Sequence, residues 1–289
     1  MPLFTGPAWR VVRRAWLLLL CVTIPLVGVG TVYFVLVVRQ AHQDTPSIVH
    51  KAWLRHGHAV KLDALSEERL QWLLAVEDPS FFQHRGVDVS TPGAGMTTIS
   101  QGLVKLLYFP EGFQPGFAKL RQTLIARYAF DAQVSKREQL ALLLNMAYLG
   151  EHEGKPVRGF AKAARVYFAK PFTALSDEEY LSLVAMLMAP NRLKPGSSAL
   201  ADRLTRVHAL LNGKYRPSKV SDVDYDGGHD MTWEQALFTT FVQWLALNER
   251  AESLESLGAN EGEVGREQGG YWGNAIAHAC ALDHAHWKL

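Results

Sequence analysis

The sequence has little cysteine and no excess of charge of either sign, and these two shortages exclude several classes of protein. Only Cys21 and Cys280 are present among 289 residues, which leaves no disulfide framework and no paired-cysteine zinc site. The net charge of +2 gives no reason to expect a nucleic-acid partner. Because 48% of the residues are hydrophobic and only 20% are charged, the chain is not disordered, collagenous or a coiled coil.

The longest uncharged stretch, Ala15 to Val38, is predicted to form a helix that crosses a membrane. At ~1.5 Å per residue such a helix is roughly 36 Å long, enough to span a bilayer with some tilt. Arginines are concentrated on its N-terminal side, at Arg10, Arg13 and Arg14. The positive-inside rule therefore predicts that residues 1–14 lie in the cytoplasm.

A cleaved signal peptide is the alternative for this stretch. The apolar core of a signal peptide is ~7–15 residues long and is followed by a small-x-small cleavage site. This stretch is longer and no clean cleavage site follows it, so an uncleaved anchor is favoured. We therefore expect a single-pass protein of the inner (cytoplasmic) membrane whose main domain is periplasmic or otherwise extracytoplasmic.

Helix signals dominate the remaining chain and strand alternation is scarce, so the expected fold class is mainly α. Residues 39–65 are predicted to connect the anchor to a helical domain over 66–215, and a linker and C-terminal extension of unknown role follow over 216–289. Capping-box serines mark helix starts at Ser135 and Ser176. Helices are predicted over 66–77, 97–109, 118–132, 135–149, 160–168, 176–189, 199–212 and 232–257.

Glu77 is the first candidate for chemistry. It continues the apolar stripe of the helix that begins at Ser66, so it faces the core or a cleft. The stripe consists of Leu70, Leu73 and Leu74. Partial burial raises the pKa of a glutamate toward the range of a general base or acid. The alternative is a helix-end glutamate that pairs with His84 or Arg85.

The segment that starts at Glu77 carries a longer pattern. It reads E-D-P-S-F-F-Q-H-R-G-V-D and resembles the first motif of the family 51 glycosyltransferases, the peptidoglycan glycosyltransferases, which is E-D-x-x-F-x-x-H-x-G-x-D. The fixed positions are filled by Glu77, Asp78, Phe81, His84, Gly86 and Asp88. Six fixed letters at fixed spacing make this match specific.

A second segment, residues 97–105, resembles the family's G-S-T-I-T-Q-Q-L-x-K-N motif. On a helix, Thr98, Gln101 and Lys105 share one face, and their hydroxyl, amide and ammonium groups suit phosphate oxygens. The alternative is a solvated polar face with a single lysine. Further matches in the family's order, among them S-K at 135–136, extend the resemblance over residues 66–211.

The resemblance fails at two places that matter for the chemistry. Family members carry a second glutamate at the start of the third helix, and counting back from S-K puts Thr123 there, or Gln122 with a one-residue shift. The basic pair before it is altered, although Lys119 and Arg121 keep the helix cationic. Only residues 89–94 stand where the family carries a helix and a mobile loop, so the substrate groove is predicted to be shortened.

The resemblance implies a lysozyme-like helical domain that polymerises lipid II at a membrane. It implies that Glu77 is the general base on the acceptor 4-hydroxyl, while undecaprenyl pyrophosphate leaves the donor with inversion. The groups implied to hold the pyrophosphate are Thr98, Gln101, Lys105, Lys119 and Arg121. The implied partners are lipid II, the membrane and other cell-wall synthesis proteins. No cofactor is certain, and the resemblance leaves a divalent cation open.

Two other functions stay open on the sequence. The missing second glutamate favours a non-catalytic relative that binds lipid II or a cell-wall partner. A lysozyme-like enzyme that cleaves glycans with Glu77 as acid is the third hypothesis. It is the least favoured, because the motifs match transferases and the cationic helix suits pyrophosphate.

Two weaker signals concern metals. Asp222, Asp224, Asp226 and Gly227 match the start of a calcium loop, but position 12 of that loop is Trp233. A solvated acidic linker is therefore the favoured interpretation. A second group of side chains near the C-terminus has ligating chemistry, namely His278, Cys280, Asp283, His284 and His286. A frayed His-rich tail is favoured there, so no metal site is predicted.

Overall fold

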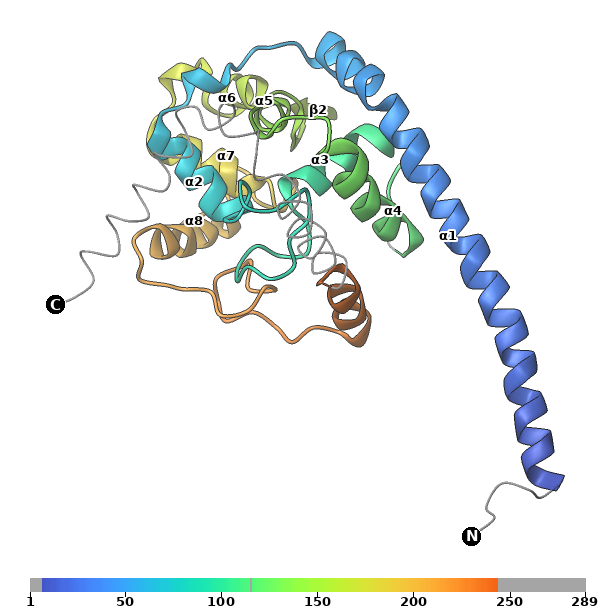
Figure 1. Ribbon diagram of the computed structural model, residues 1–289. Helices are drawn as coiled ribbons and strands as arrows, with labels where there is room; N and C mark the ends of the chain where they lie inside the picture. Colours follow the sequence, from blue (N-terminus) through green and yellow to red (C-terminus); the bar gives the residue numbers. More distant parts are fainter. Residues whose placement is uncertain (1–6, 115, 244–289) are drawn as a thin grey trace, which may run out of the picture. The chain divides into compact units, whose positions relative to one another are not determined.

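The computed structural model describes residues 7–114 and 116–243 (Figure 1). The chain divides into two units, Met1–Ala236 and Leu237–Leu289. All of the motif residues belong to the first unit. The His-rich segment near the C-terminus lies outside the described residues.

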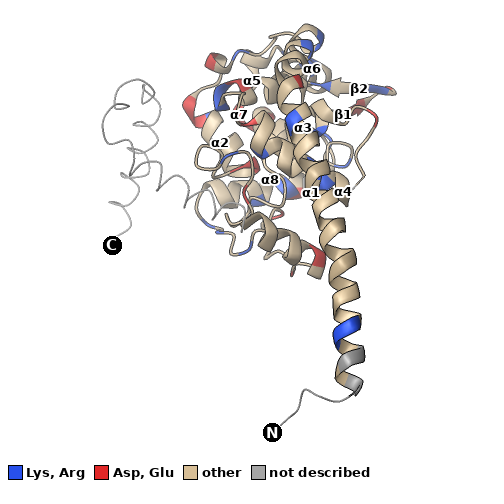
Figure 2. Cartoon of the chain, turned by 45° about the vertical axis from the view of Figure 1, so that its right-hand side comes forward, with Lys and Arg blue, Asp and Glu red and all other residues tan. Residues whose placement is uncertain are grey.

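The first element is one long helix, α1 (Pro7–His56). It contains an apolar window of mean hydropathy 2.3 that is long enough to cross a membrane. Figure 2 shows no charged residue between the basic group near the helix start and the helical domain. The helix then continues through most of the predicted connector, where it adds to the core the buried residues Ala41, Val49 and Ala52.

The helical domain follows the predicted pattern closely. Its α-helices are α2 (Glu67–Glu77), α3 (Ile99–Tyr108), α4 (Phe117–Ile125), α5 (Lys136–Met146), α6 (Phe160–Phe168), α7 (Asp177–Met186) and α8 (Ser198–Leu211). Ser66, Ser135 and Ser176 cap α2, α5 and α7 as predicted, each accepting a hydrogen bond from the backbone amide three residues on. Shorter elements are the 3₁₀ turns η1 (Leu62–Ala64) and η3 (Phe172–Ala174) and the π-helix η2 (Ala126–Phe130).

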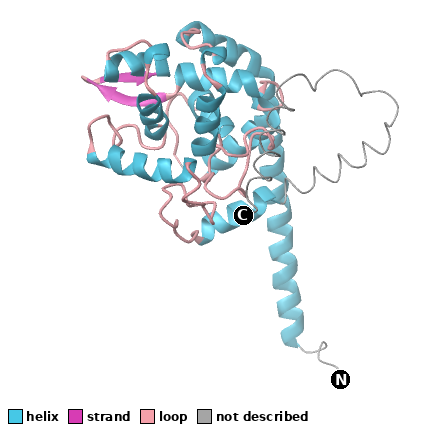
Figure 3. Ribbon diagram, turned by 90° about the vertical axis from the view of Figure 1, so that its left-hand side faces the viewer, coloured by secondary structure: helices cyan, strands magenta, loops and turns pink. Residues whose placement is uncertain are grey.

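A β-hairpin interrupts the helices where none was predicted. The strands β1 (Tyr148–His152) and β2 (Lys155–Arg158) pair antiparallel at the edge of the domain (Figure 3). The prediction of a helix through residue 149 is wrong, because α5 ends at Met146. Glu153 and Gly154 between the strands both have positive φ, 51° and 72°, which is the conformation that a two-residue hairpin turn requires.

The core brings the motif-bearing helices together. Helices α5 and α7 contribute side chains with no exposed surface, including Leu140 and Leu144 from α5 and Leu183 and Val184 from α7. Helix α2 packs on α7 and α8, whereas α3 packs on α4 and α5. Figure 1 shows α1 passing beside α4 and α3, and its C-terminal part contacts both. The two motifs meet where the amide of Ile99 at the start of α3 donates to the Asp78 carboxylate after α2.

Candidate active site

Glu77 is the last residue of α2, and its side chain is half-buried, as its place in the apolar stripe predicts. Burial raises the pKa of this carboxyl to about 7. The guanidinium of Arg203 on α8 opposes that rise, and the neighbouring charge of Asp78 adds to it. At neutral pH the carboxyl is therefore divided between its acid and base forms, which suits proton transfer.

Asp78 joins the end of α2 to the start of α3. Its side chain is fully buried, and it accepts hydrogen bonds from His84 Nε2 at 2.9 Å and from the backbone amide of Ile99 at 3.0 Å. His84 is thus the partner of Asp78, so the predicted alternative that it pairs with Glu77 is wrong. Phe81 lies edge-on to the His84 ring and has 1% of its surface exposed. These residues fix where Glu77 stands.

Gly86 and Asp88 shape the loop that follows. Gly86 has a φ of 78°, and a Cβ at this position would lie 2.5 Å from the Ala126 carbonyl oxygen, so only glycine fits. Burial alone would raise the pKa of Asp88, but hydrogen bonds from Ser80, Thr91 and Ser90 outweigh it and hold the pKa well below its usual range. Asp88 is therefore an ionised carboxylate that organises the loop.

Thr98 and Gln101 are both buried and hydrogen-bonded within the protein. Thr98 caps α3 and donates its hydroxyl to the Gly86 carbonyl at 2.7 Å. Gln101 completes the capping box by accepting from the Thr98 amide, and its side-chain amide donates to Thr123 Oγ1 at 2.9 Å. Their contact with phosphate stays a prediction. The hydrogen bonds show that they hold the start of α3 against the motif loop and against α4.

Cationic side chains gather on α3 and α4. Lys105 is exposed, with its ammonium 5.2 Å from the centre of the Phe113 ring. Lys119 Nζ donates to Thr97 Oγ1 at 2.9 Å, and burial together with the charge of Lys105 lowers its pKa to about 8. The guanidinium carbon of Arg121 lies over the Phe109 ring, 5.1 Å from its centre. Thr97 lies two residues before Ile99, whose amide binds Asp78, so Lys119 contacts the segment that also meets the end of α2.

No carboxylate stands at either position predicted for the second acid. Thr123 donates its hydroxyl to the Lys119 carbonyl at 2.8 Å while accepting from Gln101, and it has 1% of its surface exposed. Gln122 donates to the Gln101 carbonyl at 2.6 Å. Both side chains thus take part in the packing of α4 on α3. Neither of these two positions supplies a second acid.

Two residues near Glu77 were not predicted from the sequence, namely Arg203 and Tyr225. Arg203 has 1% of its surface exposed and exerts its charge on Glu77 from α8. Tyr225, in the predicted linker, donates its hydroxyl to the Val76 carbonyl at 3.1 Å. Arg203 could have been found, because it occupies the apolar stripe of α8 between Leu200 and Val207. No comparable pattern marks Tyr225.

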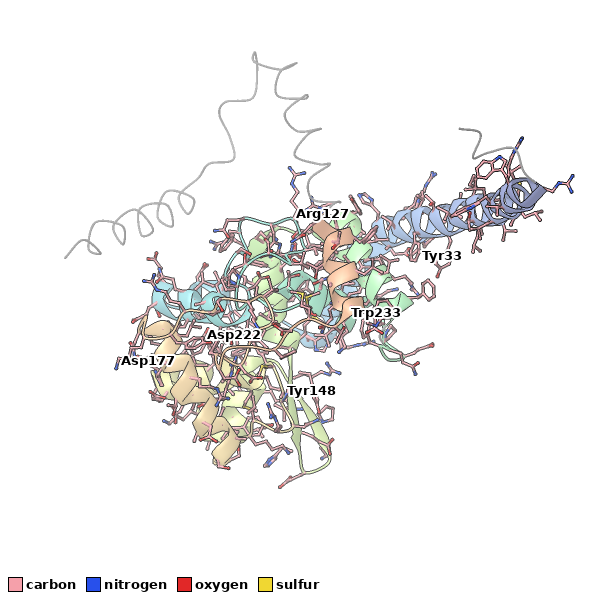
Figure 4. All side chains as sticks on the ribbon, turned by 90° about the horizontal axis from the view of Figure 1, so that it is seen from below. Tyr33, Arg127, Tyr148, Asp177, Asp222 and Trp233 are labelled. Carbon is pink, nitrogen blue, oxygen red and sulfur yellow. The ribbon has the colours of Figure 1, made fainter. Side chains whose placement is uncertain are left out.

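The acidic segment after α8 is exposed over much of its length, as expected of a linker, but two of its side chains are buried. Asp222 is fully buried, and Tyr225 has 3% of its surface exposed. Asp222 is labelled in Figure 4. The Asp222 carboxylate accepts hydrogen bonds from the Tyr215 hydroxyl and from the amides of Asp226 and Gly227. Among residues 7–114 and 116–243, no group of three or more His, Cys, Asp or Glu side chains is placed to hold a metal ion.

Comparison with known proteins identifies the family. A family model described as transglycosylase matches residues 47–213. Penicillin-binding protein 1B of Buchnera aphidicola subsp. Acyrthosiphon pisum is 30% identical over 170 residues, which are 53% of this chain and 22% of that protein. Penicillin-binding protein 1B of Escherichia coli is 30% identical over 136 residues, 43% of this chain and 16% of its own. A Cupriavidus necator protein named as a transglycosylase is 25% identical over 227 residues, 74% of this chain and 96% of its own.

The family model covers more than half of the chain, so the chain belongs to the transglycosylase family. The fold is accordingly a mainly α, lysozyme-like helical domain behind one apolar N-terminal helix. The match begins within α1 and so takes in its last turns as well as the predicted domain. The chain spans about a fifth of the length of the penicillin-binding protein from Buchnera named above.

Proposed function

We propose that this chain is a membrane-anchored peptidoglycan glycosyltransferase that polymerises lipid II. Glu77 takes the proton from the acceptor 4-hydroxyl, and that oxygen attacks the donor's anomeric carbon with inversion. The bond to undecaprenyl pyrophosphate breaks, and the pyrophosphate leaves with the electron pair. The observation that carries the proposal is Glu77 itself, half-buried at the end of α2 with a pKa of about 7.

The cationic side chains on α3 and α4 support a site for the leaving pyrophosphate. Lys105 and Lys119 are close enough for the charge of one to lower the pKa of the other. Two like charges held together are stabilised by an anion between them, and negative charge develops on the pyrophosphate in the transition state. The side chains that contact the leaving pyrophosphate in this proposal are those of Lys105, Lys119 and Arg121. Thr98 and Gln101 serve it indirectly, because their hydrogen bonds position α3.

The anchor supports the same substrate class. A lipid-linked donor and a protein held by α1 stay at one membrane surface, which removes a search through solution. The three arginines before the apolar stretch favour a cytoplasmic N-terminus and an extracytoplasmic domain. Other cell-wall synthesis proteins are proposed partners, with no specific surface assigned to them.

A second candidate function rests on the missing second acid. A relative that binds lipid II without polymerising it would keep the cations and the fold while tolerating the buried Thr123. Glycan cleavage with Glu77 as acid is a third outcome, and it differs in its product because cleavage shortens chains while transfer lengthens them. Residual catalysis can persist when one catalytic group is lost but electrostatic stabilisation remains, which keeps the transferase first.

The test is incubation of the purified full-length chain with labelled lipid II in detergent, with binding and product length measured together. Chain growth that Glu77→Gln abolishes supports the transferase. Binding without growth, weakened by Lys105→Ala, supports the binding protein instead. Shortening of added glycan strands supports the cleaving enzyme. Lys162→Ala is the matched control for Lys105→Ala, because Lys162 on α6 donates only to the Pro156 carbonyl at the hairpin.

A further inference from the structure

The segment over residues 215–230, here called the C-terminal strap, lies beyond the part matched by the family model. Its backbone is bound to the loop between the first two motifs, where the amide of Gly93 donates to the Lys219 carbonyl and that of Gly95 to the Val220 carbonyl, both at 2.9 Å. The strap is therefore a docked part of the domain.

The glycines of the motif loop are shaped to receive the strap. A Cβ at Gly93 would lie 2.8 Å from Pro217, and one at Gly95 would lie 2.8 Å from Val223. Both glycines also have positive φ, 79° and 70°, so a side chain at either position would be strained as well as crowded. The close fit indicates that loop and strap form one surface.

Tyr225 links the strap to Val76, the residue before Glu77. Its hydroxyl donates to the Val76 carbonyl, one of the carbonyls that the end of α2 leaves without a helical partner. Its ring lies under the guanidinium of Arg203 at 4.5 Å. Its backbone has a φ of 57°, a left-handed conformation that a bulky residue adopts only where its surroundings enforce it.

We propose that the C-terminal strap forms a wall of the Glu77 site and that Tyr225 is a positioning residue for Glu77. The inference rests on the proposed function for its consequence in catalysis. Tyr225 acts in two ways: it holds the last turn of α2 through Val76, and it shields the Glu77 carboxyl from water together with Arg203. The part matched by the family model is then insufficient to form the complete site.

The charges that face Glu77 allow a directional test. Burial raises its pKa, Arg203 on α8 lowers it, Asp78 on its own segment raises it, and the strap contributes the hydroxyl of Tyr225. Burial is the largest of these influences. Removing the Tyr225 ring admits water, so the pKa of Glu77 falls toward that of a free glutamate. Removing the Arg203 charge while keeping an apolar chain makes the pKa rise.

The experiment is a carbon NMR titration of full-length protein in detergent, labelled at the glutamate carboxyl carbon. The Glu77 signal is the one that disappears in Glu77→Gln. We expect a midpoint near 7 in the parent chain, a clear fall in Tyr225→Ala and a rise in Arg203→Met. In Tyr225→Phe we expect a smaller fall, because this variant keeps the shielding ring but loses the hydrogen bond to Val76. An unchanged midpoint in Tyr225→Ala overturns the inference, as does an equal fall in Tyr225→Phe.

Tyr225→Leu replaces Tyr225→Ala if the latter does not unfold cooperatively, because it retains apolar volume at the buried site. Its midpoint falls less, since the ring is lost but part of the shielding remains; no fall contradicts the role of Tyr225. The titration needs no turnover. A chain that fails to polymerise lipid II yet titrates as expected disproves the proposed function alone, and one that polymerises lipid II with an unmoved midpoint disproves the role of Tyr225 alone.

Discussion

The side-chain amide of Gln101 donates to the hydroxyl of Thr123 at 2.9 Å, and this bond closes the place where a second catalytic acid was sought. Both side chains are buried, with 0% and 1% of their surface exposed. The Thr123 hydroxyl in turn donates a hydrogen bond to the Lys119 carbonyl. The position therefore serves the packing of α4 on α3, and Glu77 is left as the carboxyl with a pKa suited to proton transfer.

Thr123→Val should destabilise the protein by about 1–3 kcal/mol, because it leaves the buried Gln101 amide without its acceptor. Thr123→Ser keeps the hydroxyl and is the control. It loses a buried methyl group, so its own cost should be smaller, about 1 kcal/mol. Urea unfolding followed by circular dichroism compares the three chains. Equal free energies of unfolding for the parent and Thr123→Val would show that the Gln101–Thr123 hydrogen bond does not stabilise the fold.

Glu77→Gln should make the protein more stable at alkaline pH. The folded state holds the Glu77 proton up to about pH 7, whereas the unfolded chain releases it near 4.5, so the parent loses stability as pH rises between these values. The glutamine variant does not bear this cost. We expect no difference below pH 4.5 and a gain of about 1–3 kcal/mol above pH 7.

Thermal unfolding from pH 4 to 8 measures this difference. Glu111→Gln is the control, since Glu111 is an exposed carboxyl in the loop after α3. A gain from Glu77→Gln that is the same at every pH would contradict the assignment of a raised pKa to Glu77.

Pyrophosphate binding should be coupled to proton uptake at Lys119. The pKa of this lysine is about 8 in the free protein, so at pH 8 about half of its amines are uncharged, and a bound anion raises that pKa. Calorimetric titration in two buffers of different ionisation enthalpy counts the protons. Lys119→Arg keeps the charge without the titration, so binding should persist while the uptake disappears. Equal uptake in the two chains would assign the proton elsewhere.

Gly86→Ala should destabilise the domain by more than about 2 kcal/mol, since it combines a left-handed backbone with a Cβ only 2.5 Å from the Ala126 carbonyl oxygen. Gly102→Ala on α3 is the matched control: nothing lies within 4 Å of the added carbon, and alanine favours the helix by up to about 1 kcal/mol. In denaturant unfolding, the midpoint should therefore fall for Gly86→Ala and rise for Gly102→Ala. A stable Gly86→Ala protein would show that the motif loop adapts.

The sequence predicts local structure well wherever a capping residue meets a regular apolar stripe. Ser66, Ser135 and Ser176 set the starts of three helices because a cap is a local hydrogen bond. The hairpin at Glu153 and Gly154 was missed because its strands are short and their pairing depends on the turn conformation.

The candidate site was predictable in its motifs but not in its surroundings. Glu77 and the cation Lys105 stand out in the sequence, whereas the charge of Arg203 reaches Glu77 only through the packing of α2 on α8. The polar composition of 216–230 indicated an exposed linker, yet Asp222 accepts hydrogen bonds from the strap's own amides, which allows its carboxylate to be buried. Contacts of this kind, between residues far apart in the sequence, produce no hydrophobic periodicity from which they could be predicted.

Whether Glu77 is the general base can be measured through the rate of lipid II polymerisation as a function of pH. We expect a rate that rises with pH as the carboxyl loses its proton, with a midpoint near 7, and no chain growth at any pH in Glu77→Gln. A rate with no such midpoint, or chain growth that survives Glu77→Gln, would contradict the role of Glu77 as general base.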